Sequence, residues 1–153
     1  MKIVVNKCYG GFGVSAKCLY ELIKRKSKAV EIVKAKDWWS NKDDIEKEIR
    51  EEIERSKYRG KSKNLKLPKG WIVNWTNCII DTKKKIVYRV DKYNQDYDVR
   101  TDPDLIELIE KKGTKWANGE HANLQITEIP DGVEYTVEEY DGQEWIAEKH
   151  RTW

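Results

Sequence analysis

The 153-residue sequence has few cysteines, few histidines and no long apolar run. Its three cysteines, Cys8, Cys18 and Cys78, cannot all pair within one chain, and none stands in a CxxC spacing. This pattern excludes a disulfide framework and, with only two histidines as further ligands, argues against zinc. No stretch approaches the roughly 18 apolar residues of a membrane span, and the first apolar run is too short for a secretory signal. We therefore expect a cytoplasmic protein with reduced thiols and without a metal, a cofactor or a membrane partner.

Aromatic and charged residues are plentiful instead. Seven Trp and eight Tyr stand against one Phe. Trp and Tyr combine a large apolar body with a hydrogen-bonding tip, so they suit both a compact core and a binding surface. Residues 1–100 carry 25 basic and 14 acidic side chains, a net charge of +11, whereas residues 101–153 carry 5 and 13, a net charge of −8. The basic part could meet a phosphate-bearing partner, or the charges could simply sort onto solvated faces.

The order of apolar and polar residues predicts an α+β fold, with a mostly antiparallel sheet and about three helices. The β-branched run at 2–6 predicts a strand, the glycines at 8–13 predict a tight loop, and Ser15 is typical of a helix cap. These three features form an N-terminal unit of strand, glycine-rich loop and helix. We expect one α+β domain over residues 1–153, in which residues 37–70 could form a charged helical and loop insertion.

Two further helices and several short strands follow this unit. A charged helix is predicted to begin at Asp43 or Asp44, and a third helix runs from a cap at Asp102 to a stop at Gly113. Residues 140–142 are typical of a hairpin turn. The remaining strands are predicted at residues 30–33, 71–74, 78–81, 86–90, 124–129, 133–139 and 144–150.

Both ends of the chain resemble a family of small phage and prophage proteins. The resemblance lies in the opening MKIVVNKCYGGFGVS and in the closing EIPDGVEYTVEEYDGQEWIAEKHRTW, and its most specific pieces are KCYGGFG and EKHRTW. The stretch RTDPDLIELIEKKG and residues 117–119 resemble the family too, whereas residues 26–99 do not match it. The resemblance implies an accessory phage protein in the cytoplasm of a host cell. It brings no settled activity and no catalytic residue, but accessory phage proteins of this size often disarm host defences.

The glycine-rich loop and the C-terminal tail are the main candidates for a binding site. A loop between strand and helix lets the backbone approach a ligand, and the helix aims free N–H groups at an anion. Arg binds phosphate with two hydrogen bonds, and aromatic rings stack on bases. The candidate ligand-binding residues are Lys7, Tyr9, Gly10, Gly11, Phe12, Gly13, Ser15, His150, Arg151 and Trp153. In the alternative explanation the glycines relieve strain in a tight turn, while Trp153 fills the core and Arg151 pairs with a carboxylate.

Other candidates have simpler explanations. His121 beside Asn118-Gly119 is typical of a loop residue, and Cys8 of a small buried side chain. The acidic hairpin at 138–144 could bind a metal or mimic phosphates, but a solvated hairpin is the default explanation. Basic residues at 57–69 with nearby tryptophans could grip single-stranded nucleic acid, but such loops are common, so we do not expect nucleic acid as the partner.

The leading hypothesis is a non-catalytic protein that binds and sequesters a small phosphate-bearing, nucleotide-like ligand, such as an immune signal used against phages. Sequestration needs only stacking and charge pairing, which fits a chain without an evident catalytic constellation. The alternative is a protein–protein inhibitor of a host defence or replication factor, with the charge asymmetry as its contact surface. A third hypothesis is a nucleotide-modifying enzyme with His150 or His121 as acid–base. A homo-oligomer is compatible with each of them.

Overall fold

The computed structural model describes residues 1–40, 43–61 and 64–149, which form an α+β fold of helices and antiparallel strands. In chain order the elements are β1 (Lys2–Asn6), α1 (Ala16–Lys24), β2 (Glu31–Lys34), α2 (Ala35–Trp38), α3 (Ile45–Arg59), β3 (Trp71–Val73), β4 (Ile79–Asp81), β5 (Ile86–Arg89), the 3-10 helix η1 (Val99–Thr101), α4 (Pro103–Lys112), α5 (Thr114–Ala117), β6 (Leu124–Glu128), β7 (Tyr135–Tyr140) and β8 (Gln143–Glu148). The predicted α+β class and the N-terminal unit of strand, loop and helix are confirmed, whereas the antiparallel strands form three sheets rather than the one sheet predicted.

The expected number of about three helices is wrong. The described residues contain five α-helices, of which α2 and α5 are only four residues long. Four residues make little more than one helical turn, so they cannot show the apolar period by which a helix is recognised in a sequence. For this reason neither α2 nor α5 is among the helices predicted from the sequence.

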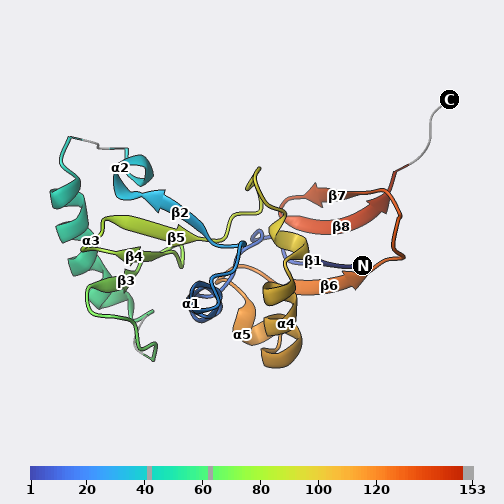
Figure 1. The fold of residues 1–153 in the computed structure, drawn as a ribbon, viewed down its shortest axis with the longest axis horizontal. Coiled ribbons are helices and arrows are strands. Elements are labelled where there is room, and N and C mark those ends of the chain that lie inside the picture. The colour runs from blue at the N-terminus through green and yellow to red at the C-terminus, as the bar shows by residue number, and fades with distance from the viewer. Residues whose placement is uncertain (41–42, 62–63, 150–153) are drawn as a thin grey trace.

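The strands of the described residues form three antiparallel sheets. Their orders are β1-β6, β2-β5-β4-β3 and β7-β8, and β8 also lies close to β1. In Figure 1 the four-stranded sheet lies with α2 and α3 at one end of the molecule, and the two smaller sheets lie with α4 and α5 at the other. Helix α1 lies between the two ends, and its place makes it the centre of the packing.

The four-stranded sheet has an apolar cluster on each face. Tyr88 of β5 pairs with Ile32 of the neighbouring strand β2 and with Ile79 of the neighbouring strand β4, so these three side chains share one face. On this face, which packs against α1, the ring of Trp71 stacks on Tyr88 with centroids 5.1 Å apart. The opposite face carries a smaller cluster of Val33, Trp38, Trp39, Ile72, Cys78, Ile80 and Val87.

The main core is continuous from one end of the molecule to the other through α1. One face of this helix is buried in the core, because Cys18, Leu19 and Leu22 are at most 1% exposed. Leu105 and Leu108 of α4 belong to the same cluster of buried side chains as the strand residues beside α1. Each fully buried aliphatic side chain of this kind stabilises the fold by about 1.5–3 kcal/mol.

The two helix caps predicted at Ser15 and Asp102 are confirmed. Ser15 caps α1, and its hydroxyl accepts a hydrogen bond of 3.0 Å from the Cys18 N–H. Asp102 caps α4 by accepting from the Leu105 N–H at 2.8 Å. The same carboxylate also accepts from the Ser27 hydroxyl at 3.1 Å and the Tyr97 hydroxyl at 2.7 Å. Asp102 therefore ties the start of α4 to the loop after α1.

A buried ion pair between Glu144 and Arg100 joins β8 to η1 and to β1. The Glu144 carboxylate is fully buried and accepts two hydrogen bonds from the Arg100 guanidinium, of 2.8 and 2.5 Å. It also accepts from the Asn6 N–H at 2.8 Å, and Lys92 lies 3.2 Å away. Burial alone would raise the pKa of the Glu144 carboxyl, but the hydrogen bonds from Arg100 and Asn6 and the nearby cations hold this pKa below its ordinary value.

We expect Glu144→Gln to lower the free energy of unfolding by about 3–5 kcal/mol at pH 7, because Arg100 then stays buried without its counter-ion. The loss should shrink in acid. The lowered pKa means that the carboxylate stabilises the fold above its ordinary pKa of 4.5, and that this stabilisation disappears as the pH falls below that value. Urea unfolding at pH 7 and at acid pH measures both effects.

The control for this experiment is Glu148→Gln, which removes an exposed carboxylate from the same strand. It should change stability by no more than about 0.5 kcal/mol. A cost of Glu144→Gln below about 1 kcal/mol, the value of an exposed ion pair, would contradict the prediction. A larger cost that does not change with pH would contradict its electrostatic explanation.

Candidate functional site

The glycine-rich loop after β1 is held in place by the side chain of Asn6. The amide nitrogen of Asn6 donates to the Cys8 carbonyl at 2.6 Å and to the Gly142 carbonyl at 2.8 Å. Its amide oxygen accepts from the Asn123 N–H at 2.8 Å. The Asn6 side chain is fully buried. One residue therefore fastens the loop to the β7–β8 turn and to the segment before β6.

Two glycines are required by close backbone approach. A Cβ added to Gly10 would lie 2.0 Å from the His121 carbonyl oxygen, which is far inside van der Waals contact. A Cβ added to Gly142, whose φ is +87°, would lie 2.4 Å from the Tyr9 carbonyl oxygen. Gly10 is therefore required by the structure of the loop itself. The close packing of both glycines also fixes the position of the loop relative to its neighbours.

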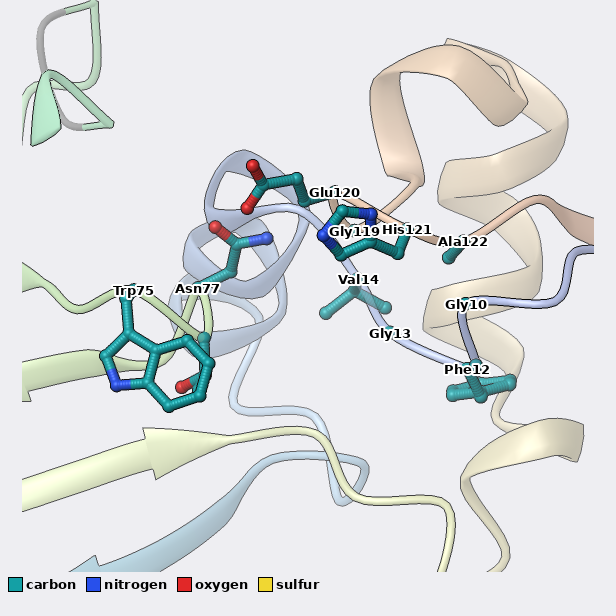
Figure 2. Close-up of a pocket in the computed structure, with 12 residues that line it drawn as sticks. Gly10, Phe12, Gly13, Val14, Trp75, Asn77, Gly119, Glu120, His121 and Ala122 are labelled. Carbon is teal, nitrogen blue, oxygen red and sulfur yellow. The ribbon is translucent and has the colours of Figure 1, made fainter. Parts of the chain in front are cut away.

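A hollow of about 190 Å³ lies between the glycine-rich loop and the β3–β4 turn. Gly10 to Val14 form one wall, residues 119–122 form a second and residues 75–77 a third. Figure 2 shows Trp75 on one side of this hollow and His121 on the other, with Asn77 between them. The indole of Trp75 is 66% exposed. An exposed indole beside a hollow is a surface on which a flat ring can stack.

A basic hollow of about 360 Å³ adjoins the first and shares Asn77 and Glu120 with it. Three lysines line it, namely Lys17, Lys61 and Lys115, against the single carboxylate of Glu120. Lys61 is placed by the β3–β4 turn, because its ammonium donates to the Trp75 carbonyl and, at 3.0 Å, to the Asn77 side chain. The net charge of this lining is therefore +2 at neutral pH.

The beginning of α1 also lines the basic hollow. The cap at Ser15 uses the Cys18 N–H, and the Ser15 carbonyl accepts from the Leu19 N–H at 2.9 Å. The N–H groups of Ala16 and Lys17 find no acceptor within the described residues, as expected for the first helical positions. Their partial positive charge adds to that of the lysines.

The structure brings together only part of the predicted site. Gly10, Gly11, Phe12 and Gly13 line the first hollow, and Ser15 lines the basic one. His150, Arg151 and Trp153 lie outside the described residues, so their role stays a prediction.

Two remaining candidates do not line either hollow, and the β7–β8 hairpin meets the loop at its turn. Lys7 and Tyr9 belong to neither lining, and Tyr9 is 64% exposed. The turn before β8 contacts the glycine-rich loop through Gly142.

Phe12 has a partner of its own. The Arg100 guanidinium lies over its ring at 4.8 Å, and the same ring lines a third hollow of about 240 Å³ toward Arg89. The cation–π contact connects the loop to the buried ion pair of Glu144. Phe12 therefore fixes the loop as well as lining the hollow.

Two of the three thiols, Cys18 and Cys78, are buried, whereas Cys8 is half-buried rather than buried as expected. All three cysteines are free, and burial raises the pKa of Cys18 to about 12. Burial also raises the pKa of Cys78 above its ordinary value. Among the residues that the structure describes, no three His, Cys, Asp or Glu side chains gather where they could hold a metal ion. None of the helices in the described ranges is long and apolar enough to cross a bilayer.

Comparisons of the chain with protein-family models, curated proteins and solved structures gave no match. The resemblance to small phage proteins therefore stays a prediction.

The sequence analysis did not connect the lysines and tryptophans of the two hollows with the glycine-rich loop, although Lys61 lies in the basic stretch 57–69. They come from four separate segments, represented by Lys17, Lys61, Trp75 and Lys115, which no local motif connects. One signal was present: Trp75 stands between Asn74 and Thr76 in a short polar turn, where a large aromatic residue has no core to fill.

We expect Gly10→Ala to lower the free energy of unfolding by about 1–3 kcal/mol, because the added methyl group forces the loop away from His121. Gly13→Ala is the matched control. Nothing lies within 4 Å of a Cβ added there, and neither glycine has a positive φ. The control should be neutral or stabilising by up to about 1 kcal/mol, through the unfolded chain. Equal unfolding free energies of the two variants in urea would show that the loop does not depend on this contact.

Proposed function

We propose that the protein binds and sequesters a small phosphate-bearing, nucleotide-like ligand in the two adjoining hollows beside the glycine-rich loop. The observation that carries the proposal is the cluster of Lys17, Lys61 and Lys115 next to the exposed indole of Trp75. In this arrangement the phosphates lie against the lysines and a base stacks on Trp75. The two hollows share Asn77 and Glu120, so one ligand can reach both.

Charge supports phosphate as the group that is bound. A phosphate monoester carries a charge of about −1.5 to −2 at neutral pH, which matches a lining of three lysines and one carboxylate. Lys17 and Lys115 have no ion pair within the described residues, so they need not break one to bind an anion. The free N–H groups at the start of α1 supply further donors on the same side.

The surroundings of His121 support holding the ligand rather than transforming it. A histidine that acts as a catalytic base is oriented by a second group that hydrogen-bonds its other nitrogen. His121 is exposed, and among the described residues no side chain hydrogen-bonds its imidazole. The expected biological setting rests on the resemblance to small phage proteins, from which we propose that the ligand is a nucleotide signal of antiphage immunity.

We expect Lys17→Glu and Lys115→Glu each to weaken nucleotide binding by about tenfold or more, because each reverses a charge that faces the phosphates. Isothermal titration calorimetry with ADP and with a cyclic dinucleotide measures this, together with mass spectrometry of small molecules released by denaturing the purified protein. Lys66→Glu is the control, because it makes the same charge change on an exposed lysine outside both linings. If the purified protein releases no nucleotide and neither probe gives heat, the proposal fails.

Trp75→Ala separates base stacking from phosphate binding. Stacking of a base on an aromatic ring is worth about 1–3 kcal/mol, so the variant should bind nucleotides at least about fivefold more weakly. Its affinity for inorganic pyrophosphate, which has no base, should not change. If Trp75→Ala weakens the binding of nucleotides and of pyrophosphate equally, Trp75 maintains the structure of the β3–β4 turn and does not stack on the ligand.

A further inference from the structure

The four-stranded sheet has two edges at which no further strand of the described chain pairs, and α3 contacts one of them. Its order is β2-β5-β4-β3, so β2 and β3 are the edge strands. Helix α3 contacts β3, whereas the outer side of β2 has no strand beside it within the described residues. An uncovered edge strand is a template onto which another extended chain can add.

The register shows which backbone groups of β2 face outward. The Ala35 N–H donates to the Lys85 carbonyl, and β2 pairs with β5 so that Val33 lies opposite Val87. In an antiparallel pair, alternate residues bond to the partner strand, so the groups of Glu31 and Val33 point toward β5. The N–H groups of Ile32 and Lys34 and the carbonyl of Ile32 therefore point away from the sheet, where no strand of the described residues pairs with them.

An apolar side chain lies uncovered beside these groups. Ile32 is 61% exposed, although it lies on the face of the sheet that packs against α1. Together with Ile23, Val30 and Tyr88 it lines a hollow of about 310 Å³ at the edge of β2. This hollow can receive an apolar side chain from a strand added to β2.

Positive charge lies at both ends of the edge. Lys26 lines the hollow around Ile32 at the beginning of β2. At the end of β2, Lys34, Lys36 and Lys84 line a second hollow, whose floor is formed by apolar side chains. These four lysines are exposed and form no ion pair with the residues that the structure describes.

We propose that β2 binds an extended segment of a partner protein by strand addition, and that this segment carries apolar residues at its centre and acidic residues at both ends. The outward N–H groups of Ile32 and Lys34 and the Ile32 carbonyl supply main-chain hydrogen bonds, the hollow at Ile32 takes an apolar side chain, and the lysines attract the acidic ends. A second copy of this chain is a poorer occupant, because antiparallel pairing of two β2 strands would bring the Lys26 end of one against the Lys34 end of the other.

This surface is separate from the proposed ligand site. The strand edge is formed by β2, whereas the basic hollow is formed by the start of α1, the β3–β4 turn and residues near α5. The two linings have no residue in common. Loss of either activity by mutation can therefore be told apart from loss of the other.

The first experiment uses the full chain and three synthetic peptides. The peptide DDVTVTDD has apolar residues at its centre and acidic ends, and KKVTVTKK reverses its charge. The third has the sequence of the first with alternate N-methylated amides, which cannot donate to a strand edge. Fluorescence anisotropy should show binding of DDVTVTDD, binding of KKVTVTKK at least about tenfold weaker, and no binding of the methylated peptide. Equal binding of the methylated peptide, or no binding of any peptide at millimolar concentration, overturns the proposal.

Amide hydrogen exchange followed by NMR locates the bound peptide. In the free protein the Val33 amide should exchange slowly and those of Ile32 and Lys34 quickly. Adding DDVTVTDD should slow exchange at Ile32 and Lys34 and leave Val33 unchanged. Protection that appears elsewhere and not at these two amides overturns the proposed place of binding.

Variants of the chain complete the test. Lys34→Glu should weaken binding of DDVTVTDD by about tenfold, and Ile32→Thr, which keeps a β-branched side chain but removes apolar surface, by about fivefold. Lys149→Glu reverses an exposed charge directly after β8, which lies at the other end of the molecule (Figure 1), and should leave the affinity unchanged. Sedimentation equilibrium of the protein alone should show no self-association that depends on Ile32. A dimer that Ile32→Thr dissolves would put a second copy at this edge and overturn the proposal.

Discussion

The arrangement of β1, β8 and η1 depends on the hydrogen bonds that the buried Glu144 carboxylate accepts. This carboxylate joins β8 to η1 through Arg100 and to β1 through the Asn6 N–H. A charge removed from water costs several kcal/mol unless its partners meet it with good geometry, so this group tolerates few positions of its neighbours. Arg100 also donates to the Val4 carbonyl and lies over the Phe12 ring. The same guanidinium therefore determines where β1, β8 and the glycine-rich loop lie.

This constraint explains why the loop is suited to binding. A loop of three glycines would be mobile in isolation, because glycine loses more conformational freedom on folding than any other residue. Here Asn6 holds its beginning, Phe12 packs on Arg100, and Gly10 lies against the backbone of His121. A wall that is already ordered costs little further entropy when a ligand binds. The proposed site thus gains its rigidity from a polar network that itself does not touch the ligand.

The sequence predicted features that depend on neighbouring residues, such as helix caps. It did not predict contacts between residues that lie far apart in the chain. Ser15 and Asp102 could be recognised as caps because a cap is defined by the few residues that follow it. The pairing of Glu144 with Arg100, 44 residues apart, leaves no such trace. The glycine-rich loop was identified as one wall of a site, but Lys61 and Trp75 reach it only through the folding of the middle of the chain. Their contribution could not be seen before the β3–β4 turn was placed beside the loop.

Helix α1 connects the two surfaces that we propose. Its first residues line the basic hollow, and Ile23 near its end lines the hollow at the edge of β2. Coupling between two sites requires an element with two arrangements that both sites can bias. Cys18, Leu19 and Leu22 bury one whole face of α1 in the core, and a close-packed interior holds a short helix in a single position. Helix α1 therefore holds both surfaces in fixed positions and does not couple them. Ligand binding and strand addition would proceed independently of one another.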